Sequence, residues 1–182
     1  KKGGERMTNK ELDSYVLDYI EGNKDAFDVI YQETKKNVYL SIYTIIKNQT
    51  TIEDLMQDTY MKIIESLNKY ELGTNFKAWS SRIARNTAIN YYNHYKKQVI
   101  VDVSENETLF GTTERKDYLI DDVIKILDDE IEREVFIHRI VLNYTLKESG
   151  GILDIPLTTI AFKYKKALKK IKKYLGGEQK WN

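Results

Sequence analysis

Residues 75 to 97 read NFKAWSSRIARNTAINYYNHYKK and predict a single long helix. Asn75 is a suitable N-cap, and neither Gly nor Pro interrupts the residues that follow. The residues expected to face a core recur at helical spacing and are Phe76, Trp79, Ile83, Ala84, Thr87 and Tyr91. The opposite side carries Arg82, Arg85, Ile89, Tyr92 and Lys96.

This outer side combines cations with flat aromatic rings. Such a mixture is typical of a surface that contacts phosphates and unstacked bases together. A core helix with a charged outer face and incidental tyrosines explains the same segment equally well. The residues of this helix alone leave both interpretations open.

The composition predicts a helical protein without a metal or cofactor. The 182 residues leave room for one large or two small domains, and one proline and nine glycines favour helices. The absence of cysteine excludes disulfides and cysteine-ligated zinc, and the two histidines lie far apart in the sequence. No apolar run could span a bilayer, and the first residues, KKGGERM, lack the apolar region of a secretory signal, so we expect a cytoplasmic protein.

The formal net charge of +1 conceals a strong polarity along the chain. Residues 101 to 134 contain twelve acidic and four basic residues, whereas residues 163 to 182 contain eight lysines and one glutamate. The lysine-rich block could contact nucleic acid. The acidic block is typical of a solvated linker and helix face.

Three helices are expected ahead of residue 75. Thr8 and Glu11 form a capping box for the first, which ends near Gly22, and the second covers about 25 to 47. The first six residues, KKGGER, can be encoded by a purine-rich stretch of the kind that bacterial ribosomes bind. We therefore expect translation to start at Met7.

The third helix, about 51 to 68, exposes a polar face. Asp54, Gln57 and Asp58 lie at i, i+3 and i+4, so they share one side and could accept hydrogen bonds from arginines of another protein. A local explanation also exists, because Glu53 and Asp54 would lie in the first turn, where the helix dipole favours negative charge. The loop YELGT, residues 70 to 74, then leads into the long helix and is a natural site for reading a ligand.

The second half predicts about four helices, at 116–128, 130–143, 146–153 and 157–175. The short connection Asp154-Ile-Pro joins the last two in the proportions of a helix-turn-helix. The last helix should face the core with Leu157, Ile160, Ala161, Tyr164, Ala167 or Leu168, and Ile171. Its more exposed residues should be Thr158, Thr159, Phe162, Lys163, Lys165, Lys166, Lys169, Lys170 and Lys173. Such a helix is suited to binding DNA. The alternative is a lysine-rich amphipathic tail helix that contacts membranes or simply keeps the protein soluble.

The order of these parts resembles the sigma-70 family of bacterial RNA polymerase sigma factors, specifically the compact extracytoplasmic-function (ECF) group. DLMQDTY at residues 54–60 is similar to the family pattern D-L-x-Q-[ED]-x-[FY] of region 2.2. FKAW at 76–79, RIARNTA at 82–88 and Asn90-Tyr resemble regions 2.3 and 2.4, and the segment from Arg133 onward resembles region 4 more loosely. The paired glycines at 150–151 depart from the family and predict a weak helix, since each costs about 1 kcal/mol in a helix interior.

The resemblance implies an all-α protein with two small helical domains joined by a flexible linker. Region 2 would cover 7–97, the linker 98–115, and region 4, the helix-turn-helix, 116–175. Core RNA polymerase, through its beta-prime and beta subunits, and promoter DNA would be the partners. An anti-sigma factor is a further candidate partner. Neither a small-molecule substrate nor catalysis is implied.

The resemblance also assigns residues to roles. Asp54, Gln57 and Asp58 would bind the clamp helices of the beta-prime subunit. The minus-10 element would contact Tyr70, Gly73, Thr74, Asn75, Trp79, Arg82, Arg85, Asn86, Tyr92 and Lys96. The minus-35 element would contact Thr158, Thr159, Phe162, Lys163 and Lys166.

Two other classes of protein remain as alternatives. A stand-alone helix-turn-helix regulator with an N-terminal sensor domain explains the second half equally well, but it leaves Arg82 and the polar face at Asp54 unexplained. A helical interaction protein without a DNA role does not account for the clustered C-terminal lysines. An enzyme is disfavoured because no nucleophile with a base, phosphate loop or ligand cluster can be assembled.

Overall fold

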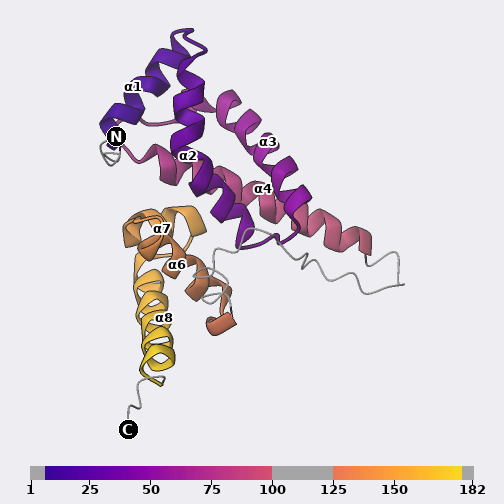
Figure 1. Cartoon of the computed structure of the whole chain (residues 1–182), viewed down its shortest axis with the longest axis vertical. Coiled ribbons are helices and arrows are strands. Elements are labelled where there is room, and N and C mark those ends of the chain that lie inside the picture. Colours follow the sequence, from indigo (N-terminus) through magenta and orange to yellow (C-terminus); the bar gives the residue numbers. More distant parts are fainter. Residues whose placement is uncertain (1–6, 100–124, 178–182) are drawn as a thin grey trace, which may run out of the picture. The chain divides into compact units, whose positions relative to one another are not determined.

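A computed structural model describes residues 7–99 and 125–177, with side chains over 7–95 and 125–174. The chain divides into two units between Gly111 and Thr112. Every element within the described residues is helical, which confirms the all-α class (Figure 1). The elements are α1 (Asn9–Ile20), α2 (Ala26–Tyr43), α3 (Gln49–Glu65), η1 (Leu67–Lys69), α4 (Phe76–Val99), α6 (Glu130–Ile140), α7 (Leu146–Leu153) and α8 (Leu157–Gly177).

Three of the expectations lie largely outside the described residues. These are the proposed start at Met7, which concerns residues 1–6, the linker at 98–115, and most of the helix at 116–128. The helices at 130–143, 146–153 and 157–175 correspond to α6, α7 and α8.

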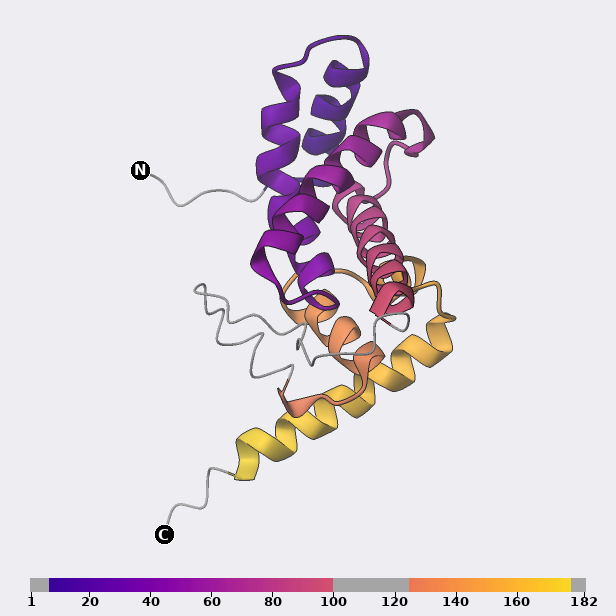
Figure 2. The same ribbon diagram turned by 90° about the vertical axis from the view of Figure 1, so that its right-hand side faces the viewer.

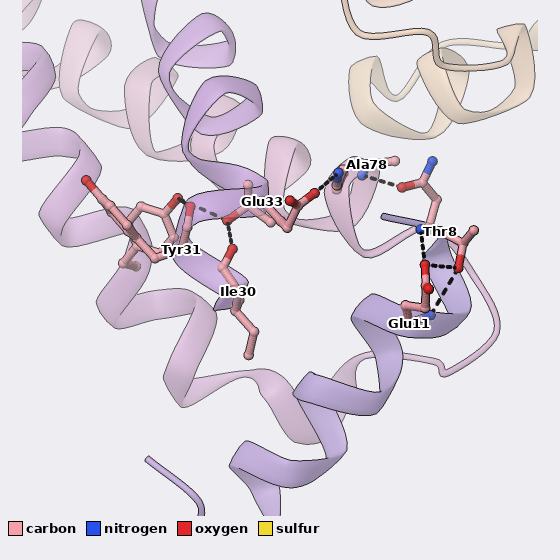
Figure 3. A network of polar contacts seen from close by, with 10 residues as sticks. Thr8, Glu11, Ile30, Tyr31, Glu33 and Ala78 are labelled. Carbon is pink, nitrogen blue, oxygen red and sulfur yellow. Dashed lines mark hydrogen bonds and ion pairs between the residues drawn. The ribbon is translucent and has the colours of Figure 1, made fainter. Parts of the chain in front are cut away.

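The first helix begins at the capping box predicted from the sequence. The Thr8 backbone nitrogen donates to a Glu11 carboxylate oxygen at 2.8 Å, and the Glu11 nitrogen donates to the Thr8 hydroxyl at 3.3 Å (Figure 3). The Thr8 backbone nitrogen and hydroxyl both donate to the Glu11 carboxylate and lower its pKa, because they favour its charged form. The helix ends at Ile20, and Gly22 then adopts φ +109°.

The core of the N-terminal unit lies between α2 and α4. Figures 1 and 2 both show these two helices side by side, with α1 and α3 packed on them. The buried positions of α4 include small residues, Ser80, Ser81, Ala84 and Ala88, each fully buried. Small side chains let two helices approach closely, which suits the packing of α4 against its neighbours α2 and α3. The Lys77 ammonium and the Glu33 carboxylate join the two helices in an ion pair of 2.7 Å (Figure 3).

The third helix starts two residues earlier than the sequence suggested. It begins at Gln49, because the Asn48 side chain caps it and accepts from the Thr51 nitrogen at 3.0 Å. Its first turn therefore contains no acidic residue, and the helix-dipole explanation for Asp54 is wrong. Ile64, which helical spacing with Tyr60 and Leu67 predicts to face the core, is exposed.

In the C-terminal unit α6, α7 and α8 pack on one another. The connection from α7 to α8 turns sharply because Asp154 adopts the left-handed conformation, with φ 57°. The Ile155 nitrogen then donates back to the Gly150 carbonyl at 3.0 Å, and the Ile160 nitrogen donates to the Pro156 carbonyl at 3.0 Å. The helix-turn-helix proportions expected around Pro156 are present.

The paired glycines do not interrupt α7, contrary to the expected weakness. A Cβ placed on Gly150 would lie 2.9 Å from the Ile155 carbonyl oxygen, whereas a Cβ on Gly151 would meet nothing within 4 Å. Gly150 is therefore required by the close approach of the turn backbone. The connection between α7 and α8 depends on this missing side chain.

Two faces of α8 are used inside the C-terminal unit. Ile160 and Ala167 are fully buried and form its core face, but Leu157, expected there, is 52% exposed. A second face carries Lys163, Lys166 and Lys170, and it is directed at acidic residues of α6 and its N-cap.

These three lysines neutralise two carboxylates. Lys163 pairs with Asp129, while Lys166 and Lys170 lie 3.0 and 2.9 Å from the fully buried carboxylate of Glu132. Burial by itself raises the pKa of Glu132, but the contacts from Lys170 and Lys166 outweigh it and leave the pKa below its ordinary value. Burial also raises the pKa of Asp129, but the contacts from Lys163 and from the Glu132 backbone nitrogen outweigh it and leave the pKa below its ordinary value.

We expect Gly150→Ala to destabilise the C-terminal unit by about 1–3 kcal/mol, because the added methyl group would collide with the Ile155 carbonyl. Gly151→Ala is the matched control. It should stabilise the unit by about 0.5–1 kcal/mol, because alanine favours a helix and this position is open. The free energy of unfolding of both variants can be measured by urea unfolding, monitored by the NMR amide signals of α7 and α8. Equal effects of the two substitutions would contradict this role for Gly150.

The stability of the C-terminal unit should fall in acid. Both carboxyls have lowered folded-state pKa values, so their contribution is present above the ordinary values of 4.5 for Glu132 and 3.8 for Asp129. It is lost as the pH falls through the folded-state values.

We expect Glu132→Gln to lower the stability at about pH 7 by about 1–3 kcal/mol and to make the acid loss shallower. Glu130→Gln, on the same helix but exposed, is the control. The free energy of unfolding of both variants and of the wild type is measured at several pH values by NMR-detected urea unfolding. Parallel pH profiles for wild type and Glu132→Gln would refute this assignment.

Candidate polymerase and nucleic-acid interfaces

The polar face of α3 is exposed as expected. Asp54, Gln57 and Asp58 are all exposed, and their side chains form no hydrogen bond or ion pair among the described residues. Further along the same face lie Met61, 62% exposed, and Ile64. An apolar patch beside a polar rim is typical of protein–protein interfaces. The spacing from Asp54 could have indicated both residues, but Met61 was not singled out from the sequence and Ile64 was expected in the core.

The outer face of α4 brings together most of the predicted nucleic-acid residues. Arg82, Asn86 and Tyr92 are exposed, and Arg85 is half-buried. Lys96 lies in α4, but its side chain is outside the described part of the chain. Asn93 is exposed, seven residues after Asn86, and therefore belongs to this face although it was not identified from the sequence.

The α3–α4 loop, residues 70–75, requires a correction at Tyr70. Tyr70 was expected to contact DNA, but it is only 8% exposed, and its hydroxyl donates to Asp13 Oδ1 at 2.7 Å. Its ring packs edge-on against Phe76, with centroids 4.9 Å apart, and lies 5.4 Å from the half-buried Trp79. Tyr70 is therefore part of the buried packing that supports the loop.

The other predicted residues of the loop lie closer to the surface. Gly73 and Thr74 are exposed, while the Asn75 side chain caps α4 by accepting from the Ala78 nitrogen at 3.2 Å (Figure 3). Leu72, 47% exposed, was not identified from the sequence. An exposed leucine beside an exposed glycine provides an apolar surface on which a flat base could lie.

The third face of α8 lies opposite its core face, and two of the lysines predicted to contact DNA lie outside it. Thr158, Thr159 and Phe162 are exposed as expected, with Phe162 63% exposed. Lys163 and Lys166, expected to contact DNA, instead pair with Asp129 and Glu132.

The lysines that share the exposed face are Lys165, Lys169, Lys172 and Lys173. None of the four forms an ion pair within the described residues. We call Thr158, Phe162 and these four lysines the open face of α8. A strict helical count from Thr158 could have identified it, but the sequence does not show which lysines face α6.

No helix within the described residues has both the length and the apolar character needed to cross a membrane. The exposed features are thus an acidic and apolar face on α3, a cationic and aromatic face on α4 beside the α3–α4 loop, and the open face of α8.

Comparison with known proteins identifies a family model and several relatives similar to this chain. The Sigma-70 region 2 family matches residues 30–98. The ECF RNA polymerase sigma factor SigX of Bacillus subtilis is 21% identical over 171 residues, covering 84% of each chain. SigW of the same organism is 24% identical over 170 residues, covering 85% of this chain and 91% of the relative.

A solved structure shares the fold. The sigma factor RpoE of Bartonella quintana, crystallised with the anti-sigma factor NepR, superposes with a TM-score of 0.65 at 20% identity. The match covers 82% of this chain and 96% of RpoE. Residues 30–98 thus match Sigma-70 region 2, and along most of its length the chain is similar to extracytoplasmic-function RNA polymerase sigma factors.

Proposed function

We propose that this chain is a sigma factor that binds core RNA polymerase, recognises the minus-10 and minus-35 promoter elements and promotes DNA melting. The N-terminal unit acts as region 2 and the C-terminal unit as region 4. The relatives are sigma factors and not enzymes, and the chain supplies binding energy to the polymerase without catalysis of its own.

The observation that carries this proposal is the exposed face at Asp54, Gln57 and Asp58. It lies within the segment that matches region 2, and neither the helix dipole nor an internal partner among the described residues accounts for its two carboxylates. Exposed carboxylates next to an apolar patch fit a partner that offers arginines around an apolar centre. That partner is the clamp-helix region of core polymerase.

The outer face of α4 and the α3–α4 loop act on the minus-10 element. Arg82 and Arg85 attract the phosphates of the non-template strand, and Tyr92 offers a ring for base stacking. Extruding a base from the duplex costs a few kcal/mol, so a surface that holds the extruded base favours the melted state. The exposed loop residues Leu72, Gly73 and Thr74 form that surface.

The open face of α8 acts on the minus-35 element. The N-terminal residues of a recognition helix contact base edges and later lysines contact phosphates. Thr158 and Phe162 therefore face bases, with Phe162 suited to a thymine methyl group, and Lys165 and Lys169 face the backbone.

Docking on polymerase makes the two contacts cooperative. Once one unit is bound, the other binds intramolecularly at high effective concentration, so two modest contacts together give promoter selectivity. This also fits the nearly balanced net charge of +1, since the chain alone gains little non-specific affinity for DNA. The protein works in the cytoplasm, and an anti-sigma factor, such as the one that binds RpoE, is a candidate regulator.

Run-off transcription with purified core polymerase on a genomic promoter library tests this function. We expect initiation to require the chain and to fall by about tenfold or more in the Asp54→Ala, Asp58→Ala double variant, because charge-assisted contacts are lost. A Glu21→Ala, Asp25→Ala double variant, with the same charge change on exposed residues, is the control. Absence of initiation while the chain alone shifts duplex DNA would favour a stand-alone helix-turn-helix regulator.

The open face of α8 predicts which lysines govern the salt dependence of promoter binding. Each phosphate contact contributes about one unit to the slope of log affinity against log salt concentration. In the Lys165→Ala, Lys169→Ala variant, which loses two such contacts, this slope should therefore become shallower by about two units. The Lys163→Ala, Lys166→Ala variant carries the same charge change but should retain most of the slope. Filter binding of holoenzyme to a promoter found by run-off measures both. The reverse pattern would place the DNA contacts on the face that pairs with α6.

A further inference from the structure

The buried carboxylate of Asp13, on α1, contacts the α3–α4 loop at two points. Its Oδ1 accepts from the Tyr70 hydroxyl at 2.7 Å, and its Oδ2 accepts from the backbone nitrogen of Gly73 at 2.7 Å. Asp13 is only 8% exposed. A carboxylate is costly to bury unless hydrogen bonds replace its water, and these two donors come from the loop. Helix α1 is therefore bonded to the loop as well as packed beneath it.

The same contacts determine the shape of the loop. Gly73 adopts φ +84°, and the Thr74 hydroxyl donates to the Glu71 carbonyl at 2.6 Å, which closes a turn. The Tyr70 hydroxyl also lies 3.1 Å from the Thr74 carbonyl. Burial, reinforced by Asp13, raises the pKa of Tyr70, so its hydroxyl remains a donor. Both ends of the turn are thus attached to one carboxylate.

We infer that Asp13 is a positioning residue, which holds the α3–α4 loop in the conformation that captures the extruded minus-10 base. This inference rests on the proposed function and extends it to α1, which precedes the segment matched by region 2. Asp13 itself lies beneath the loop and does not touch DNA.

A loop that is already ordered lowers the free-energy cost of capturing a base. Extrusion already costs a few kcal/mol, and a loop that had to be ordered during binding would add to that cost. A loop already fixed by two short hydrogen bonds to α1 avoids this addition. Loss of Asp13 should therefore weaken the recognition of one base while leaving the α3 face intact.

The test uses the full chain assembled with core polymerase. A randomised pool of single-stranded DNA is selected on wild-type holoenzyme, and a fluorescent copy of the selected strand is the probe. We expect Asp13→Ala to weaken probe binding by about tenfold and to flatten the base preference at one position, with unchanged affinity for core polymerase. Asp13→Asn keeps one acceptor and should restore part of the preference.

Asp18→Ala is the matched control, since it removes a carboxylate from α1 that has no bond to the loop among the described residues. A folded Asp13→Ala variant with the wild-type base preference would overturn the inference. So would an equal loss of core-polymerase affinity, which would indicate a general structural role.

If Asp13→Ala fails to fold, Tyr70→Phe decides, because it keeps the ring on Phe76 and removes only the hydroxyl. A flattened base preference supports the inference, and an unchanged one refutes it. A wild-type holoenzyme that selects no strand at all would instead refute the proposed function.

Discussion

The close packing of α4 against α2 is the contact on which the N-terminal unit depends. Ser80, Ala84 and Ala88 of α4 are fully buried, α2 and α4 pack against each other, and an ion pair between Lys77 and Glu33 adds to that contact. Once the small residues face inward, the helical period directs Arg82 and Tyr92 outward on a rigid support. The candidate DNA surface is therefore a consequence of core packing.

The charges of the C-terminal unit serve two purposes that look alike in the sequence. Lys166 and Lys170 neutralise a carboxylate that α6 buries, whereas Lys165 and Lys169 lie on a neighbouring, exposed face of the same helix. A buried carboxylate with a lowered pKa is stable only while paired. The lysine-rich composition of α8 thus supports both the fold and the proposed DNA contact.

Local signals in the sequence predicted much of this protein. The capping box at Thr8, the extended helix after Asn75 and the bounds of α7 all depend on neighbouring residues, and each was confirmed. The exposed polar face of α3 followed from helical spacing alone. The resemblance to ECF sigma factors rested on the motifs at residues 54–60 and 76–88 and agrees with the family match.

Contacts between distant residues could not be predicted in this way. Asp13 and Tyr70 are 57 residues apart, and Lys163 and Asp129 are 34 apart, so nothing local shows that Tyr70 is buried or that Lys163 is paired. From the sequence alone Gly150 would only weaken a helix, but in the structure the Ile155 carbonyl lies so close that no side chain fits at this position. The helices and their faces come from short-range periodicity and capping, which the sequence contains. The choice of which polar groups are buried and paired arises only when separate helices meet.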